Sequence, residues 1–103
     1  MRGMLAVLAM LPVWAAPVLA QDAAEGRRLA EQWCANCHRI APDGPGPVSD
    51  AVPSFMAIAM RPGRTMGSIS TFLRTPHASM PDHGLTLRQS QDLAAYLLSQ
   101  RPR

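Results

Sequence analysis

The run Cys34-Ala35-Asn36-Cys37-His38 constrains this chain more than any other feature of its sequence. Two thiols three residues apart lie about one helical turn apart, so each can add to one vinyl group of the same porphyrin. The adjacent histidine is then carried under the iron, where an imidazole nitrogen can serve as an axial ligand. The run therefore predicts one covalently bound haem c per chain, attached at Cys34 and Cys37, with His38 on the iron.

A C-x-x-C pair also occurs in redox-active disulfides and in halves of zinc sites. A redox-active pair of the thioredoxin kind accompanies alternating strands and helices, a pattern that this sequence lacks. A zinc ion could use both cysteines together with His77 and His83, but His38 would then have no role. Haem attachment accounts for more of the sequence than either alternative.

Residues 1–20 have the features of a secretory signal. Arg2 supplies a positive charge, an apolar stretch follows it, and Val18-Leu19-Ala20 supplies residues suited to cleavage before Gln21. The alternative is an uncleaved membrane anchor, but two prolines interrupt the stretch, which is short for a span of about 20 residues. We therefore expect a signal peptide over 1–20 and one domain over 21–103, in the periplasm and not stably inserted in a membrane.

The chain after residue 21 is predicted to be all-α, because no alternating strand pattern occurs in it. Asp22 and Glu25 have the spacing of a helix N-cap, and this first helix should continue into Cys34. Thr86 and Gln89 form a capping-box pattern that starts a last helix ending near residue 100. Short helices are expected over 53–60 and 65–74, separated by loops over 40–53 and 75–85 that are rich in turn formers.

The second axial position of a His-ligated haem iron decides what the iron can do. Met80 is the candidate, because it lies in a loop and Pro81 fixes the backbone beside it. His77 and His83 lie in the same loop and are the alternatives. A thioether favours ferrous iron and raises the reduction potential, and an iron with both positions filled can only gain and lose an electron.

The charge of the chain argues against nucleic-acid binding. The formal net charge is +3, and the ten basic residues are all arginines scattered along the sequence without a basic run. Such a distribution is typical of an ordinary solvated surface. We therefore expect no nucleic-acid partner.

Taken together, these motifs resemble those of small class I c-type cytochromes of the bacterial periplasm. The resemblance covers roughly residues 24–99 and rests on Gly26, Cys34–His38, Gly44–Pro47, Pro53-Ser54-Phe55, Ser79-Met80-Pro81 and Leu93–Leu97. It implies the cytochrome c fold, in which the N- and C-terminal helices cross beside a covalently bound haem. Two or three short helices and long loops complete that fold.

The resemblance also implies roles for particular residues. It implies thioether bonds at both cysteines, His38 and Met80 on the iron, and packing of Gly26 against Tyr96 where the two long helices cross. The family further implies that a prolyl carbonyl in the loop after the histidine accepts a hydrogen bond from its Nδ1, which fixes the ring. Either Pro45 or Pro47 could supply this carbonyl. The residues expected to line the haem pocket are Phe55, Ile58, Phe72, Leu85 and Leu97.

Two positions depart from the family or leave alternatives open. The tryptophan that holds a haem propionate in longer relatives has no counterpart here, and Arg61, Arg64 or backbone donors could replace it. Trp33 directly precedes the first cysteine. It is either a half-buried helix residue or an apolar docking contact at the exposed haem edge.

The resemblance implies a monomeric one-electron carrier and not an enzyme. Its expected partners are redox proteins, namely a membrane oxidoreductase, an oxidase or a dehydrogenase. A haem c subunit of a periplasmic oxidoreductase complex is the alternative, and a stable co-purifying partner would favour it. A ligand-sensing haem protein in which Met80 can be displaced is a third class.

Overall fold

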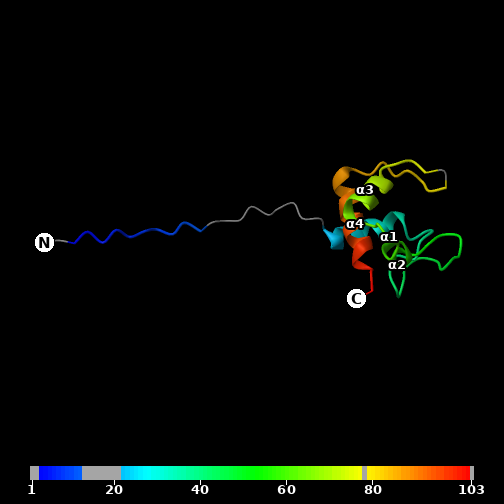
Figure 1. Ribbon diagram of the computed structural model, residues 1–103, viewed down its shortest axis with the longest axis horizontal. Helices are drawn as coiled ribbons and strands as arrows, with labels where there is room; N and C mark the ends of the chain where they lie inside the picture. Colours follow the sequence, from blue (N-terminus) through cyan, green and yellow to red (C-terminus); the bar gives the residue numbers. More distant parts are fainter. Residues whose placement is uncertain (1–2, 13–21, 78, 103) are drawn as a thin grey trace.

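The computed structural model describes residues 3–12, 22–77 and 79–102 of the chain (Figure 1). Four helices follow in order: α1 (Ala23–Trp33), α2 (Phe55–Ala59), α3 (Met66–Leu73) and α4 (Leu87–Ser99). Within these ranges the only β-type pairing is an isolated bridge between His77 and Met80. The all-α prediction is therefore confirmed, and both loops lie where the turn formers placed them.

The two short helices begin slightly later than the sequence predicts, because the residues expected in their first turn act as caps. The Ser54 hydroxyl accepts a hydrogen bond from the amide of Ala57 ahead of α2. Thr65 and Ser68 form a reciprocal capping box ahead of α3, and this box was not recognised in the sequence.

Residues 3–12 form extended, exposed chain without a helix or strand. Residues 1–2 and 13–21 lie outside the described residues, so the signal peptide over 1–20 stays a prediction. No helix in the described part of the chain is long and apolar enough to cross a membrane.

Helices α1 and α4 are the first and last helices of the sequence, and they lie against each other in the fold (Figure 1). The two helices approach closely at Gly26, where an added methyl would lie 2.6 Å from the carbonyl carbon of Asp92 and 2.8 Å from Cβ of Tyr96. Only a residue without a side chain permits this approach of two backbones. The expected packing of Gly26 against Tyr96 is confirmed.

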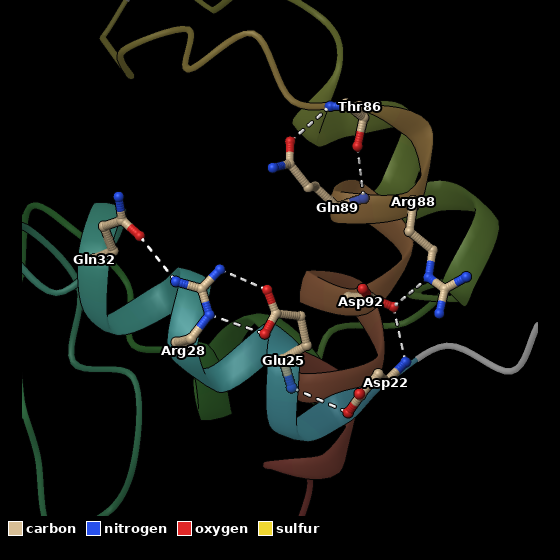
Figure 2. A network of polar contacts seen from close by, with 8 residues as sticks. All are labelled: Asp22, Glu25, Arg28, Gln32, Thr86, Arg88, Gln89 and Asp92. Atoms are coloured by element: carbon tan, nitrogen blue, oxygen red, sulfur yellow. Dashed lines mark hydrogen bonds and ion pairs between the residues drawn. The ribbon is translucent and has the colours of Figure 1, made fainter.

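The start of α1 is joined to α4 by a hydrogen bond between Asp22 and Asp92 (Figure 2). The Asp22 carboxylate accepts from the Glu25 amide at 3.0 Å, as the cap pattern predicts. The Glu25 carboxylate does not accept a hydrogen bond from the Asp22 amide, because it pairs with Arg28 at 2.6 Å. Instead the Asp22 amide donates to the buried Asp92 carboxylate on α4, at 2.8 Å, and Arg88 lies 3.5 Å from the same oxygen.

The start of α4 has the full capping box that the sequence predicts (Figure 2). The Thr86 hydroxyl accepts from the Gln89 amide at 3.1 Å, and the Gln89 side chain accepts from the Thr86 amide at 3.0 Å. Four residues further, Ser90 shares a buried hydrogen bond of 2.7 Å with Ser70, which joins α4 to α3.

The chain beyond α4 braces the connection between α2 and α3. The Arg101 guanidinium donates two hydrogen bonds to the carbonyl of Ala59, at 2.9 and 3.1 Å, and a third to the carbonyl of Arg64 at 3.4 Å. This brace holds the short α2–α3 connection in place beside the site described next.

Candidate haem-binding site

The residues predicted to attach the haem and to ligate its iron line a single cavity of about 650 Å³. Cys34, Cys37, His38 and Met80 all line it, although the methionine lies more than forty residues from the histidine in the chain. The volume falls in the range of about 300–1,000 Å³ that is typical of cofactor sites. The helices contribute apolar walls, among them Phe55, Ile58, Ile69, Leu93 and Leu97.

A tight turn at the end of α1 brings the two cysteines and the histidine together. The Cys34 amide closes the helix on Ala30 at 2.8 Å, and the amides of Cys37 and His38 both donate to the Cys34 carbonyl, at 3.2 and 2.9 Å. Cys34 is buried, whereas Cys37 is exposed, and no disulfide joins them. This local turn is why the three side chains reach a single cavity.

The state of the cysteines disfavours the two alternatives to haem attachment. Burial raises the pKa of the Cys34 thiol to about 11, whereas a redox-active cysteine has a lowered pKa. In the ranges that the structure describes, no group of three or more His, Cys, Asp or Glu side chains is arranged to hold a metal ion. The zinc set of both cysteines with His77 and His83 therefore does not form.

The imidazole of His38 is held in one orientation. Its Nδ1 lies 2.6 Å from the carbonyl oxygen of Pro53, and because a carbonyl can only accept, Nδ1 carries the proton. The Nε2 atom is thereby left as a lone-pair donor, which is the form that ligates a metal. The ring of Phe55 lies 5.7 Å away, tilted by 57°, and packs against the imidazole.

The acceptor for His38 is Pro53, so the prediction of Pro45 or Pro47 was wrong. The Pro45 carbonyl already accepts the Ile40 amide at 3.1 Å. A methyl on Gly46 would lie 2.7 Å from the carbonyl carbon of His38, so this loop packs on the backbone of the histidine and not on its ring.

Neither Pro45 nor Pro47 lines the cavity. Pro47 lies instead on a separate surface groove. The sequence held no signal for Pro53, because several prolines follow the histidine and their distances along the chain do not tell which carbonyl turns back toward the ring.

Of the other residues predicted to line the haem pocket, some line the cavity and one does not. Phe55 is buried and lines the cavity, and Phe72 lines it while staying 43% exposed. Leu85 does not line the cavity, so that prediction was wrong. It lies directly ahead of the cap of α4 and packs against the hydrophobic core. Ile69 and Leu93 were not among the predicted lining residues, but both line the cavity.

Met80 is, among the methionines that the structure describes, the one that lines the cavity. It is partly buried, as are His77 and Trp33. The half-buried reading of Trp33 is therefore confirmed, and its ring stacks on that of His83.

The Arg64 side chain in the cavity wall is suited to bind a carboxylate. Arg61 and Arg64 both line the cavity, and the Nε of Arg64 is buried without a hydrogen-bond partner in the described part of the chain. Buried donors in folded proteins are nearly always paired, so this atom indicates an acceptor on a bound group. The propionates of a haem are such acceptors. Thiols, imidazole, thioether and guanidinium together fit a haem c.

An all-α fold in which the first and last helices cross beside a cavity entered by a C-x-x-C-H turn defines a class I c-type cytochrome. The family model described as cytochrome c oxidase, cbb3-type, subunit III matches residues 21–97, and the chain belongs to that family. Cytochrome c-552 of Bradyrhizobium diazoefficiens is 40% identical over 102 residues, which are 99% of this chain and 96% of the relative. No solved structure matches the chain. The chain is an electron-transfer protein with covalent haem c, and not an enzyme.

Proposed function

We propose that the chain is a periplasmic one-electron carrier in which His38 and Met80 ligate the haem iron. The observation that carries the proposal is the shared cavity, which both residues line together with the two cysteines. When bound, haem c supplies an iron that takes up and releases one electron.

The residues of the chain have separate tasks in this proposal. His38 presents Nε2, because Pro53 holds the opposite ring nitrogen. Met80 contributes a soft sulfur, which favours the ferrous state and raises the potential. The apolar walls exclude water, and Arg64 offers its buried Nε to a propionate. Cys34 and Cys37 keep the haem attached.

The periplasmic location is supported by the first residues of the chain. Met4, Leu5 and Met10 are each more than nine-tenths exposed, which is unfavourable for apolar side chains that stay in water. A segment of this kind is suited to a membrane during export. We propose that residues 1–20 direct export and that residues 21–103 form the mature carrier.

The partners we propose are redox proteins, in particular a terminal oxidase, with a membrane oxidoreductase or dehydrogenase as donor. The description of the matching family, which names an oxidase subunit, supports the oxidase. The relative cytochrome c-552 is about as long as this chain, and this supports a small separate carrier. We propose that the carrier works as a monomer.

A haem c subunit within an oxidoreductase complex is the second candidate, and the same family description favours it. Size-exclusion chromatography of a periplasmic extract separates the two. A free carrier elutes as a small species, because even the full chain has a mass of only 11.1 kDa. A subunit elutes with its partners in a much larger complex.

The test of the iron ligation is optical spectroscopy of the purified holo-protein. We expect sharp ferrous α and β bands and, in the ferric state, the weak near-infrared band of sulfur bound to iron. Met80→Ala should remove the sulfur band. Met60→Ala is the matched control, because Met60 is 63% exposed and does not line the cavity. A holo-protein without the sulfur band, or with a band that survives Met80→Ala, contradicts the proposal.

A further inference from the structure

The loop that carries Met80 meets a helix on each side of the methionine. Three residues before it, the His77 ring lies against Phe72, with centroids 3.8 Å apart and planes tilted by 32°. Three residues after it, the His83 ring lies 5.5 Å from Trp33, with planes only 11° from parallel. Both pairs are in the range of direct aromatic contact, which is attractive beyond the area it buries.

The two aromatic partners stand on different walls of the cavity. Phe72 is on α3, and Trp33 is the last residue of α1, directly before Cys34. All four rings line the cavity together with Met80. The loop is therefore fastened across the cavity, from one wall to the other, with the methionine between the two fastening points.

Local contacts shape the loop without attaching it to the helices. His77 and Met80 pair in an antiparallel bridge. Pro81 keeps Met80 in extended backbone. The Gly84 amide donates to the Asp82 carboxylate at 2.8 Å and closes the turn that contains His83. No hydrogen bond among the described residues joins 79–83 to a helix, so this stretch is held to the helices by packing.

We propose that His77 and His83 are positioning residues that fasten the Met80 loop onto α3 and α1. The inference rests on the proposed ligation of the iron by Met80. It assigns the two histidines a task other than that of competing ligands, since each ring is engaged by a ring from a helix. Fastening at both ends keeps the thioether at the cavity and slows its displacement by small molecules.

The experiment measures how fast imidazole displaces the Met80 sulfur in the ferric holo-protein. Stopped-flow absorbance follows the loss of the near-infrared sulfur band. From the strength of an aromatic pair we expect His77→Ala and His83→Ala each to raise the displacement rate about two- to tenfold. The double variant should show roughly the product of the two increases, since the fastening points lie on different helices.

The matched controls keep a ring at each position. His77→Phe and His83→Phe retain stacking but cannot ligate iron, so their displacement rates should stay within about twofold of the unchanged protein. Urea unfolding of each variant verifies that it is folded under the conditions of the rate measurement.

The outcomes separate this inference from the proposed function. If the unchanged protein lacks the sulfur band, Met80 ligation fails and the fastening role fails with it. If the band is present but the alanine variants react at the original rate, only the fastening role is overturned. It is also overturned if the phenylalanine variants react as fast as the alanine variants, or if His77→Phe or His83→Phe abolishes the low-spin spectrum.

Discussion

Replacement of Gly26 by alanine tests the crossing of α1 and α4 on which the haem site is built. The new methyl would lie 2.6 Å from the carbonyl carbon of Asp92 and 2.8 Å from Cβ of Tyr96. Ordinary contacts between such atoms are about 3.5–4.0 Å long, so the two helices must separate by roughly 1 Å. Both neighbouring atoms are close to the backbone of α4, and they cannot move aside as the end of a flexible side chain can.

The free energy of unfolding should fall by about 2–3 kcal/mol. Overpacking of this kind costs about 1–3 kcal/mol, and here it lies at the upper end because the neighbours are rigid. Separation of the helices also weakens the 2.8 Å hydrogen bond from the Asp22 amide to Asp92, which contributes about 1 kcal/mol. The better helix propensity of alanine offsets about 1 kcal/mol of this loss.

The assay is urea unfolding of the ferric holo-protein, followed by far-ultraviolet circular dichroism. With a slope of about 1–3 kcal/mol per molar urea, the midpoint should fall by roughly 1 M or more. Gly67→Ala is the matched control, because Gly67 also lies in a helix but its nearest neighbour would be the Thr65 hydroxyl at 4.0 Å. That substitution should stabilise the protein by about 0.4–1 kcal/mol. A Gly26→Ala protein within about 0.5 kcal/mol of the original would refute the close crossing.

Three further substitutions test single contacts. Tyr96→Phe removes the buried hydrogen bond from the tyrosine hydroxyl to the Ile40 carbonyl, 2.8 Å long, and should lower the free energy of unfolding by about 1–2 kcal/mol in the same assay. Asp92→Ala leaves the first amide of the α1 cap without its acceptor and should cost about 1–3 kcal/mol, whereas an unchanged midpoint would show that water replaces the carboxylate. Arg64→Gln removes a positive charge beside the proposed propionate. Because the loss of this charge favours the ferric state, voltammetry should show a reduction potential lower by roughly 20–50 mV. Arg61→Gln, at an exposed position of the same cavity wall, should change it less, and equal shifts for both would argue against a specific role of Arg64.

The parts of the protein that depend on neighbouring residues were predictable from the sequence. Asp22 and Thr86 mark helix starts because a cap needs only the few residues that follow it. The C-x-x-C-H turn is equally local, since its geometry follows from hydrogen bonds within five residues. Gly26 was informative because a glycine inside a helix is costly unless another backbone lies against it.

What joins distant parts of the chain was decided only by the tertiary structure. The Asp22 amide finds its acceptor in Asp92, seventy residues away along the chain. The His38 ring is held by Pro53, whose carbonyl reaches it only after the long loop has turned back. His77 and His83 find aromatic partners on two helices by the same route. Such pairings depend on how helices and loops pack in space, and neither residue type nor spacing along the chain encodes the direction of a carbonyl or a ring.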